Sequence, residues 1–230
     1  MLGEQMRAIL EDARETGWVL EPEAKRLLAL AGLPVPRGTW AADLGQALEF
    51  AAGIGYPVAA KVVSRQVLHK TDAGGVAVNI DTEGDLRKVW DRFRHIQGFE
   101  GALVEEMASG IELIVGAKMD YQFGPVVLLG MGGTGVEIYN DTALRMAPLR
   151  EGDVRSMIDG LQASRVLKGY RGAEVVDLEA LTAAVRAFSE LLMQLQDLVE
   201  SVDLNPLMCT AQGCLVADAR IVLPGGGEGE

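Results

Sequence analysis

The sequence predicts an α+β protein of two lobes, a smaller N-terminal lobe and a strand-rich C-terminal lobe. Up to about residue 100, helical segments with clear start and stop signals alternate with short apolar strands. Beyond that point short strands follow one another with only turn residues between them, which favours antiparallel sheets over βαβ repeats. We therefore expect a helical arm over residues 1–19, lobes over 20–100 and 101–223, and a flexible tail over 224–230.

The N-terminal lobe is predicted from capping signals and apolar runs. Pro22 in a first turn and Gly32 after the last turn delimit a helix over Glu23–Ala31. Asp43 is placed as the N-cap of a second helix, which runs through Ala52. The remaining expected elements are a strand over Pro57–Val63, a polar loop over 64–75, a strand over Val76–Ile80 and a helix from Asp81 to about His95.

The C-terminal lobe is predicted from closely spaced strands and one long helix. Leu178–Val199 carries apolar residues on one face and is expected to pack on the core. Met208–Thr210 and Cys214–Ala217 are typical of a closing hairpin. The other expected elements are strands over Ala102–Met107, Glu112–Met119, Pro125–Leu129, Val136–Tyr139 and Ala143–Pro148, and a short helix over Asp153–Asp159.

Composition excludes several classes of function. The 230 residues include 33 acidic and 21 basic side chains, a formal net charge of −12, which disfavours nucleic-acid binding. No apolar run approaches the roughly 20 residues that a membrane span needs, and acidic residues occupy the start of the chain, so we expect a cytoplasmic protein. Two cysteines and two histidines, widely spread, argue against a zinc site. Cys209 and Cys214 are expected to be packing residues.

A glycine-rich segment over residues 130–135 fits the spacing G-x-G-x-x-G. A dinucleotide site needs a helix directly after the third glycine, and the segment that follows here is strand-like. Gly132 and Gly133 remain candidates for close approach of the backbone to a nucleotide, and a tight turn in a sheet is the alternative. No P-loop, nucleophile elbow or zinc-protease motif occurs.

Two positively charged features point to an anion. Lys61 lies inside an apolar strand, where a lysine is rarely buried without a partner. The loop that follows combines His69, Lys70, Thr71 and Asp72 with two glycines, a composition that suits folding over phosphates and carrying a nucleophile. A solvated loop histidine and a lysine pointing away from the sheet are the structural alternatives.

A third candidate site lies near the closing hairpin. Residues two apart on a strand share a face, so Asp203 and Asn205 are expected to point together. Asp218 on the partner strand completes a set of oxygen ligands of the kind Mg²⁺ prefers. The alternative is that Asp203 and Asn205 are turn residues before Pro206.

An ordered set of motifs resembles one known family. The segments PVAAKVVSRQVLHKTDAGGV, GALVEEM, GIELIVGAKMDYQFGPVVLLGMGGTGVEIYND, TALRMAPL, LKGYRG and SVDLNPLM…LVADARIVL occur in this order over about residues 20–223. Together they resemble the ATP-grasp part of NDP-forming acyl-CoA synthetases, the ADP-forming acetate–CoA ligase group, related to succinyl-CoA synthetase beta chains. The resemblance implies a two-lobed ATP-grasp fold, ATP or ADP as substrate, and Mg²⁺.

The resemblance also implies roles for particular residues. Lys61 matches the strand lysine on the nucleotide phosphates, and His69 matches a histidine that accepts a phosphoryl group. Arg145 matches an arginine near the phosphates. Further matches are Gly74 and Gly75 over the phosphates, Glu105, Glu106 and Met107 at the adenine hinge, Asn205 and Asp218 on the metal with Asp203 beside them, and Glu112 and Arg171 at recurrent positions of undefined role.

The resemblance implies an incomplete enzyme. Members of the group also have CoA-binding and ligase domains, which a chain of 230 residues does not supply. We therefore expect a CoA-binding alpha partner in a hetero-oligomer, with residues 1–19 as a partner contact or a solvated arm. Two alternatives stay open: another ATP-grasp carboxylate ligase that lacks a phosphohistidine, and a nucleotide-binding regulatory subunit without turnover.

Overall fold

The computed structural model describes residues 2–133, 141–170 and 175–226. They form two compact units. Unit 1 comprises Met1–Val19, Ala24–Val35 and Ser109–Glu230, and unit 2 comprises Leu20–Glu23 and Pro36–Ala108. Unit 2 begins at Leu20, as expected for the smaller lobe, but residues 24–35, which were expected in that lobe, belong to unit 1. Residues 1–19 belong to unit 1, and residues 101–108 belong to unit 2.

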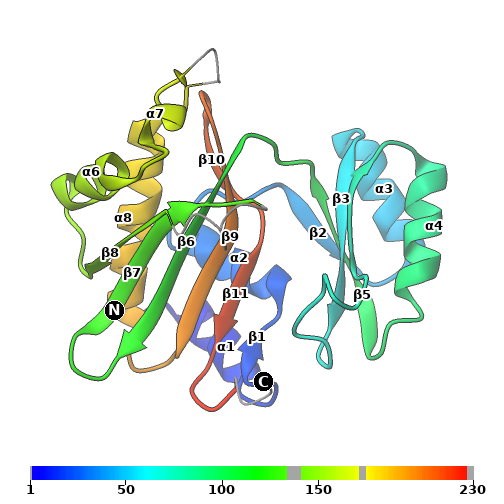
Figure 1. Cartoon of the computed structure of the whole chain (residues 1–230). Helices are drawn as coiled ribbons and strands as arrows, with labels where there is room; N and C mark the ends of the chain where they lie inside the picture. The colour runs from blue at the N-terminus through cyan, green and yellow to red at the C-terminus, as the bar shows by residue number, and fades with distance from the viewer. Residues whose placement is uncertain (1, 134–140, 171–174, 227–230) are drawn as a thin grey trace. The chain divides into compact units, whose positions relative to one another are not determined.

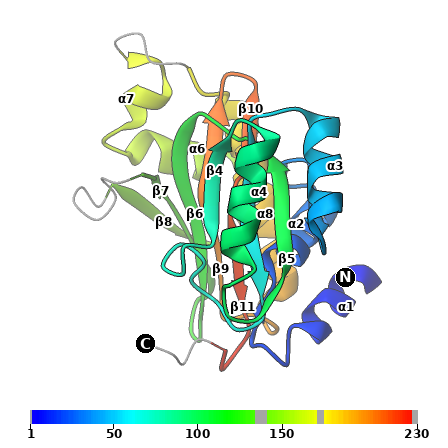
Figure 2. The same ribbon diagram turned by 90° about the vertical axis from the view of Figure 1, so that its right-hand side faces the viewer.

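Unit 2 is a four-stranded antiparallel sheet with two helices on one face (Figures 1 and 2). The strand order is β2-β5-β3-β4. Its elements are β2 (Gly38–Ala41), α3 (Leu44–Ile54), β3 (Val58–Ser64), β4 (Val76–Ile80), α4 (Glu83–Phe93) and β5 (Phe99–Glu106). Side chains of α3 and α4 bury Val58, Ala60 and Val62 of β3, because alternate residues of a strand share a face.

The other face of that sheet is covered differently. Leu20 packs there against Val63 and Leu103, with Trp40 partly buried beside them. Lys61 lies on this same face, because it alternates with Ala60 and Val62 along β3. The fold of unit 2 therefore holds Lys61 on the face opposite α3 and α4.

Unit 1 is built on a seven-stranded antiparallel sheet. The strands follow the order β1-β11-β9-β6-β7-β8, with β10 paired to β9. The strands are β1 (Trp18–Val19), β6 (Ile111–Asp120), β7 (Gly124–Met131), β8 (Thr142–Met146), β9 (Ser201–Thr210), β10 (Gly213–Val216) and β11 (Ala219–Val222). The helices are α1 (Glu4–Asp12), α2 (Glu21–Leu30, with its first turn in unit 2), α6 (Glu151–Gly160), α7 (Ser164–Leu167) and α8 (Leu178–Leu195).

The core of unit 1 lies between this sheet and its helices. Phe188, Leu192 and Leu195 of α8 are fully buried and pack against the sheet face that carries Val127 and Val202. Helix α1 contributes Met6, Ile9 and Leu10 to the same core. Residues 1–19 are therefore an integral part of unit 1, and the solvated arm is not observed.

The sequence-based expectations for class and elements are largely confirmed. The α+β class and the antiparallel pairing hold in both sheets, and the expected cap Asp43 accepts a hydrogen bond from the amide of Gln46. The helix expected from Asp81 begins at Glu83, with Thr82 as its N-cap, which accepts from the amide of Asp85. Strands β1, β2 and β11 and the short α7 were not predicted. The expected strand over Val136–Tyr139 and the candidate Arg171 lie outside the described residues.

The two cysteines are buried free thiols, as expected for packing residues. Cys209 on β9 and Cys214 on β10 are direct cross-strand neighbours. A hydrogen bond with Cys214, reinforced by burial, raises the pKa of the Cys209 thiol. The Cys209 thiol therefore stays protonated, and both buried side chains act as apolar packing.

Candidate functional site

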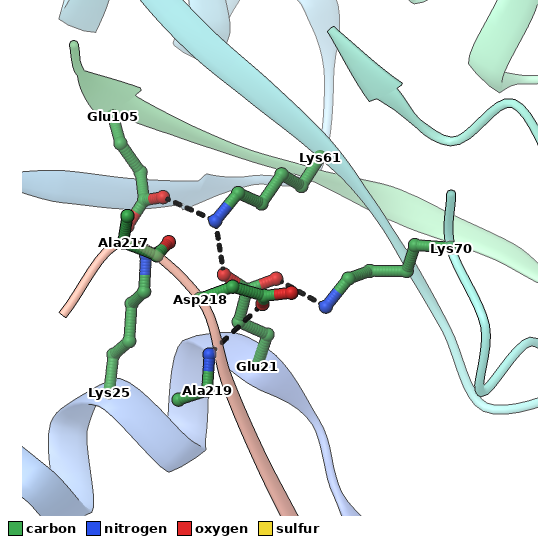
Figure 3. Close-up of polar contacts among 8 residues, drawn as sticks. All are labelled: Glu21, Lys25, Lys61, Lys70, Glu105, Ala217, Asp218 and Ala219. Carbon is green, nitrogen blue, oxygen red and sulfur yellow. Dashed lines mark hydrogen bonds and ion pairs between the residues drawn. The ribbon is translucent and has the colours of Figure 1, made fainter. Parts of the chain in front are cut away.

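The centre of the candidate site in unit 2 is a buried group of four charged side chains (Figure 3). Lys61 Nζ lies 2.6 Å from Glu21 Oε1 and 3.3 Å from Glu105 Oε2. Lys70 Nζ lies 2.5 Å from Glu21 Oε2. The exposed fractions of the side chains are 8% for Lys61, 4% for Glu21, 3% for Glu105 and 16% for Lys70. Two carboxylates balance two ammonium groups, which is the condition for burying charges of this kind.

Four different parts of unit 2 supply this quartet of Glu21, Lys61, Lys70 and Glu105. Glu21 opens helix α2, Lys61 comes from the middle of β3, and Glu105 comes from the neighbouring strand β5. Lys70 comes from the loop between β3 and β4. The quartet therefore ties the loop to the strand that carries Lys61.

The loop carries His69 on an exposed side chain. Local backbone geometry explains why glycine occupies both position 74 and position 75 of this loop. Gly74 adopts a positive φ of 67°, and a Cβ at Gly75 would overlap with the Val62 side chain. Gly75 N–H donates to Lys70 O at 2.7 Å, and Val62 N–H donates to Gly75 O at 2.8 Å. The glycines thus close the loop tightly against β3, whichever ligand it meets.

The three candidate hinge residues differ in what they contact. The Glu105 side chain belongs to the quartet. Glu106 accepts hydrogen bonds from the Arg37 amide at 2.9 Å and from the Arg37 guanidinium at 2.7 Å. Its own amide donates to Arg37 O at 2.9 Å, so that group is already used within the sheet. Met107 follows the end of β5 and is half-buried.

The Glu106–Arg37 contact changes the acidity of the carboxyl group. Burial by itself raises the pKa of Glu106, but the hydrogen bonds from Arg37 and its positive charge outweigh burial, and the pKa is lowered overall. Glu106 is therefore ionised and fixed at the end of β5.

In unit 1 the candidate metal ligands meet on two neighbouring strands. Asn205 N–H donates to Asp218 O at 3.2 Å, which places these two residues opposite each other across β9 and the start of β11. Asp218 Oδ1 accepts from the Ala219 amide at 3.0 Å, and Lys25 Nζ donates to Ala217 O at 2.7 Å beside it (Figure 3). The expected pairing of Asn205 with Asp218 is thus present in the backbone.

Asp203 lies two residues from Asn205 on β9, and the structure gives it a different partner. It is the cross-strand neighbour of Arg220, whose Nη2 lies 3.2 Å from Asp203 Oδ2. An aspartate held by arginine is a weaker candidate for a metal ligand than Asn205 and Asp218. Within the described ranges there is no group of three His, Cys, Asp or Glu side chains placed to hold a metal ion.

Arg145 does not lie on the same face of the sheet as Asp203. Its cross-strand neighbour is Val127, which belongs to the buried face that α8 covers. Asp203 is the cross-strand neighbour of Gly116, and Gly116 is the cross-strand neighbour of Leu128, so these three residues share the other face of the sheet. Arg145 Nη2 reaches Ser156 Oγ on α6 at 3.3 Å. The structure therefore separates Arg145 from the Asp203 face, and only a change of its side-chain position would bring it to phosphates there.

Glu112, at the start of β6, lies beside Gly132 and Gly133, which follow the end of β7. Gly132 N–H donates to Glu112 O at 2.7 Å, and a Cβ at Gly132 would meet Glu112 at 2.9 Å. Gly133 has a positive φ of 83°. In the described residues, the close approach that these glycines permit is to Glu112 of the same chain.

Sequence reasoning missed Glu21 and Arg220 as members of these clusters. Glu21 lies 40 positions from Lys61 and 49 from Lys70, so no local pattern connects them. The sequence could have predicted Arg220 as a neighbour of Asp218, because Arg220 follows Asp218 by two positions and residues two apart on a strand share a face.

No helix in the described part of the chain is long and apolar enough to cross a membrane.

Comparisons with known proteins give a consistent result. A family model described as an ATP-grasp domain matches residues 11–223. The beta subunit of acetate–CoA ligase [ADP-forming] II from Pyrococcus furiosus is 39% identical over 98% of this chain and 100% of the relative. Acetate–CoA ligase [ADP-forming] I from Archaeoglobus fulgidus is 37% identical over 96% of this chain but only 33% of its own length.

Solved structures agree with the sequence comparisons. An acetyl-coenzyme A synthetase from Candidatus Korarchaeum cryptofilum, solved with coenzyme A and Mg-AMPPCP, has a TM-score of 0.83 and 38% identity. The match covers 95% of this chain and 99% of that chain. Its description places a phosphohistidine segment pointing towards the nucleotide-binding site.

Proposed function

This chain belongs to the ATP-grasp family and, within it, to the beta subunits of ADP-forming acetate–CoA ligases, and from that membership we propose that it handles the nucleotide in an ADP-forming acyl-CoA synthetase. With a partner it interconverts ATP, a carboxylic acid and CoA with ADP, phosphate and an acyl-CoA. The phosphoryl group passes between nucleotide and protein on a histidine, His69.

One observation carries the assignment of His69. Glu21 binds Lys61 with one carboxylate oxygen and Lys70 with the other, so residue 70 of the loop lies one carboxylate away from Lys61. The amine proposed for the nucleotide phosphates and the imidazole proposed as carrier therefore belong to neighbouring segments of one unit. A neutral imidazole is nucleophilic near pH 7, which suits the role.

The chemistry of the step balances with these groups. An imidazole nitrogen of His69 attacks the γ-phosphorus of ATP, a P–N bond forms, and the bond to the β–γ bridging oxygen breaks to release ADP. Phosphoryl transfer needs mainly positioning and charge neutralisation, and Lys61 supplies a positive charge for it. The reverse direction returns the phosphoryl group to ADP.

We assign Mg²⁺ to Asn205 and Asp218, because an amide oxygen and a carboxylate on facing strands are the hard oxygen donors this ion takes. Bound there, Mg²⁺ would neutralise charge on the nucleotide phosphates. We leave Asp203 out of this proposed ligand pair, because its carboxylate contacts Arg220. Met107 is proposed to contact the base, and Glu105 to hold Lys61.

We also propose a CoA-binding alpha subunit as the partner. The relative from Archaeoglobus fulgidus is about three times longer than the part this chain matches, which supports a second chain carrying the remaining functions. The acid and CoA are then expected to bind mainly to that partner.

The test is to follow the phosphoryl group. The assembled complex is incubated with ATP labelled in the γ-phosphate and digested, and the phosphorylated peptide is identified by mass spectrometry under conditions that preserve phosphohistidine. We expect the label on His69 and its loss in His69→Ala, with His95→Ala as the matched control that keeps it. Turnover of a wild-type protein that never carries the label on His69 contradicts the proposal.

A further inference from the structure

We propose that Glu21 is a positioning residue for phosphoryl transfer, which fixes the loop over residues 65–75, and with it His69, by holding Lys70 against the strand that carries Lys61. The inference deepens the proposed function and rests on it. All four residues of the quartet belong to unit 2.

The geometry supports a shared carboxylate. Glu21 uses a different oxygen for each lysine, at 2.6 Å from Lys61 and 2.5 Å from Lys70. Its side chain is only 4% exposed, so solvent screens these two ion pairs less than it screens an ion pair at the surface. Replacing Glu21 therefore affects both lysines, while Lys61 keeps Glu105 at 3.3 Å.

The loop is attached elsewhere by backbone contacts. At its start, the Gln66 amide donates to Ser64 Oγ at 3.1 Å, and at its end Gly75 and Lys70 are joined by a backbone hydrogen bond of 2.7 Å. Lys70 follows His69 directly, so its side-chain contact with Glu21 is a restraint applied next to the imidazole. Breaking this contact leaves those backbone hydrogen bonds in place and removes the side-chain restraint that Glu21 applies next to His69.

The charge of Glu21 opposes nucleotide binding while its geometry assists transfer. A carboxylate beside Lys61 repels a triphosphate, so its neutralisation should leave the affinity for Mg-ATP unchanged or increase it. The same change loosens His69, and transfer depends steeply on alignment. A positioning role thus predicts opposite effects on binding and on rate, whereas general damage to the fold weakens both.

The experiment compares Glu21→Gln with Glu49→Gln in the full chain. Glu49 is an exposed acid on α3 of the same unit, so the control removes one negative charge away from the loop. Hydrogen exchange is measured at the amides of Ala73, Gly74 and Gly75, which donate to carbonyls within the loop. In the assembled complex, Mg-ATP affinity is measured by calorimetry and the rate of His69 phosphorylation by rapid quench.

We expect the three amides to exchange at least tenfold faster in Glu21→Gln, and His69 to be phosphorylated at least tenfold more slowly at saturating Mg-ATP, with affinity no weaker than in the wild type. Values equal to those of Glu49→Gln overturn the proposal, as does a parallel loss of affinity and rate. If Glu21→Gln does not fold, Lys70→Met replaces it and should give the same two changes, with recovery in Lys70→Arg. An unaffected Lys70→Met then overturns the proposal.

Failure of this inference is distinct from failure of the proposed function. A wild-type complex that turns over without phosphorylating His69 removes the function of the loop. A wild type that is phosphorylated normally, with Glu21→Gln behaving as the control, removes only the role of Glu21.

Discussion

At the scale of single residues, the structure separates the candidate metal ligands into a facing pair and an ion-paired neighbour. Asn205 and Asp218 lie opposite each other, whereas Asp203 is held by Arg220 at 3.2 Å. Arg220 competes with a metal ion for the carboxylate of Asp203. The three polar residues of this face are therefore not equivalent.

Asp218→Ala should weaken Mg-nucleotide binding by on the order of tenfold or more, because coordination loses a carboxylate. Asp203→Asn should have a smaller effect. Calorimetry across a magnesium titration measures both, with the exposed Asp197→Ala as the control. Unchanged magnesium dependence in Asp218→Ala would remove this residue from the ligand pair.

Glu106 gives a pH-dependent contribution to stability. Its pKa is lowered in the folded protein, so the contribution is present above the unfolded pKa and is lost as the pH falls through the folded value. Because the Arg37 side chain is 69% exposed, the contribution is small, on the order of 0.5 kcal/mol. Denaturant unfolding of wild type and Glu106→Gln should differ at neutral pH and converge in acid. A difference that grows in acid contradicts this sign.

At the scale of elements, α1 is part of the core of unit 1. Ile9 is 6% exposed and Leu10 likewise 6%, and both pack in the same cluster as α8. An amphipathic helix in this position gains its stability from packing rather than from helix propensity. The N-terminal segment therefore cannot be treated as a dispensable arm.

Ile9→Ala should lower the free energy of unfolding by about 2–4 kcal/mol, because it removes buried methyl groups and leaves a cavity. Glu11→Ala, on the exposed side of the same helix, should change it by less than about 0.5 kcal/mol. Denaturant unfolding monitored by circular dichroism makes the comparison. Equal, small effects of the two substitutions would mean that α1 is not packed.

The elements also show what local sequence signals can and cannot reveal. The caps Asp43 and Thr82, the apolar run of β3 and the alternation of β4 are local signals, so the corresponding elements were predicted closely. Strand β1 has two residues and β11 four, too few for a pattern to emerge. Arg145 and Asp203 lie on opposite faces of the sheet because of the register in which the strands pair, and this register is set by the whole fold and not by local sequence.

At the scale of the whole molecule, the family and its chemistry were predictable because an ordered set of motifs extends over most of the chain. The match to the ATP-grasp domain and to a complete beta subunit confirms that prediction. The Glu21 contacts were not predictable, because they join residues 40 and 49 positions apart. Motifs identify which chemistry a chain performs, while the positioning of its groups arises from long-range packing.

The central claim is that a histidine of this chain carries the phosphoryl group between nucleotide and the rest of the reaction. It is tested most directly by the exchange of labelled ADP into ATP in the assembled complex, without acid or CoA. We predict exchange in the wild type and its loss in His69→Ala with nucleotide binding retained. Exchange that persists in His69→Ala would contradict the account.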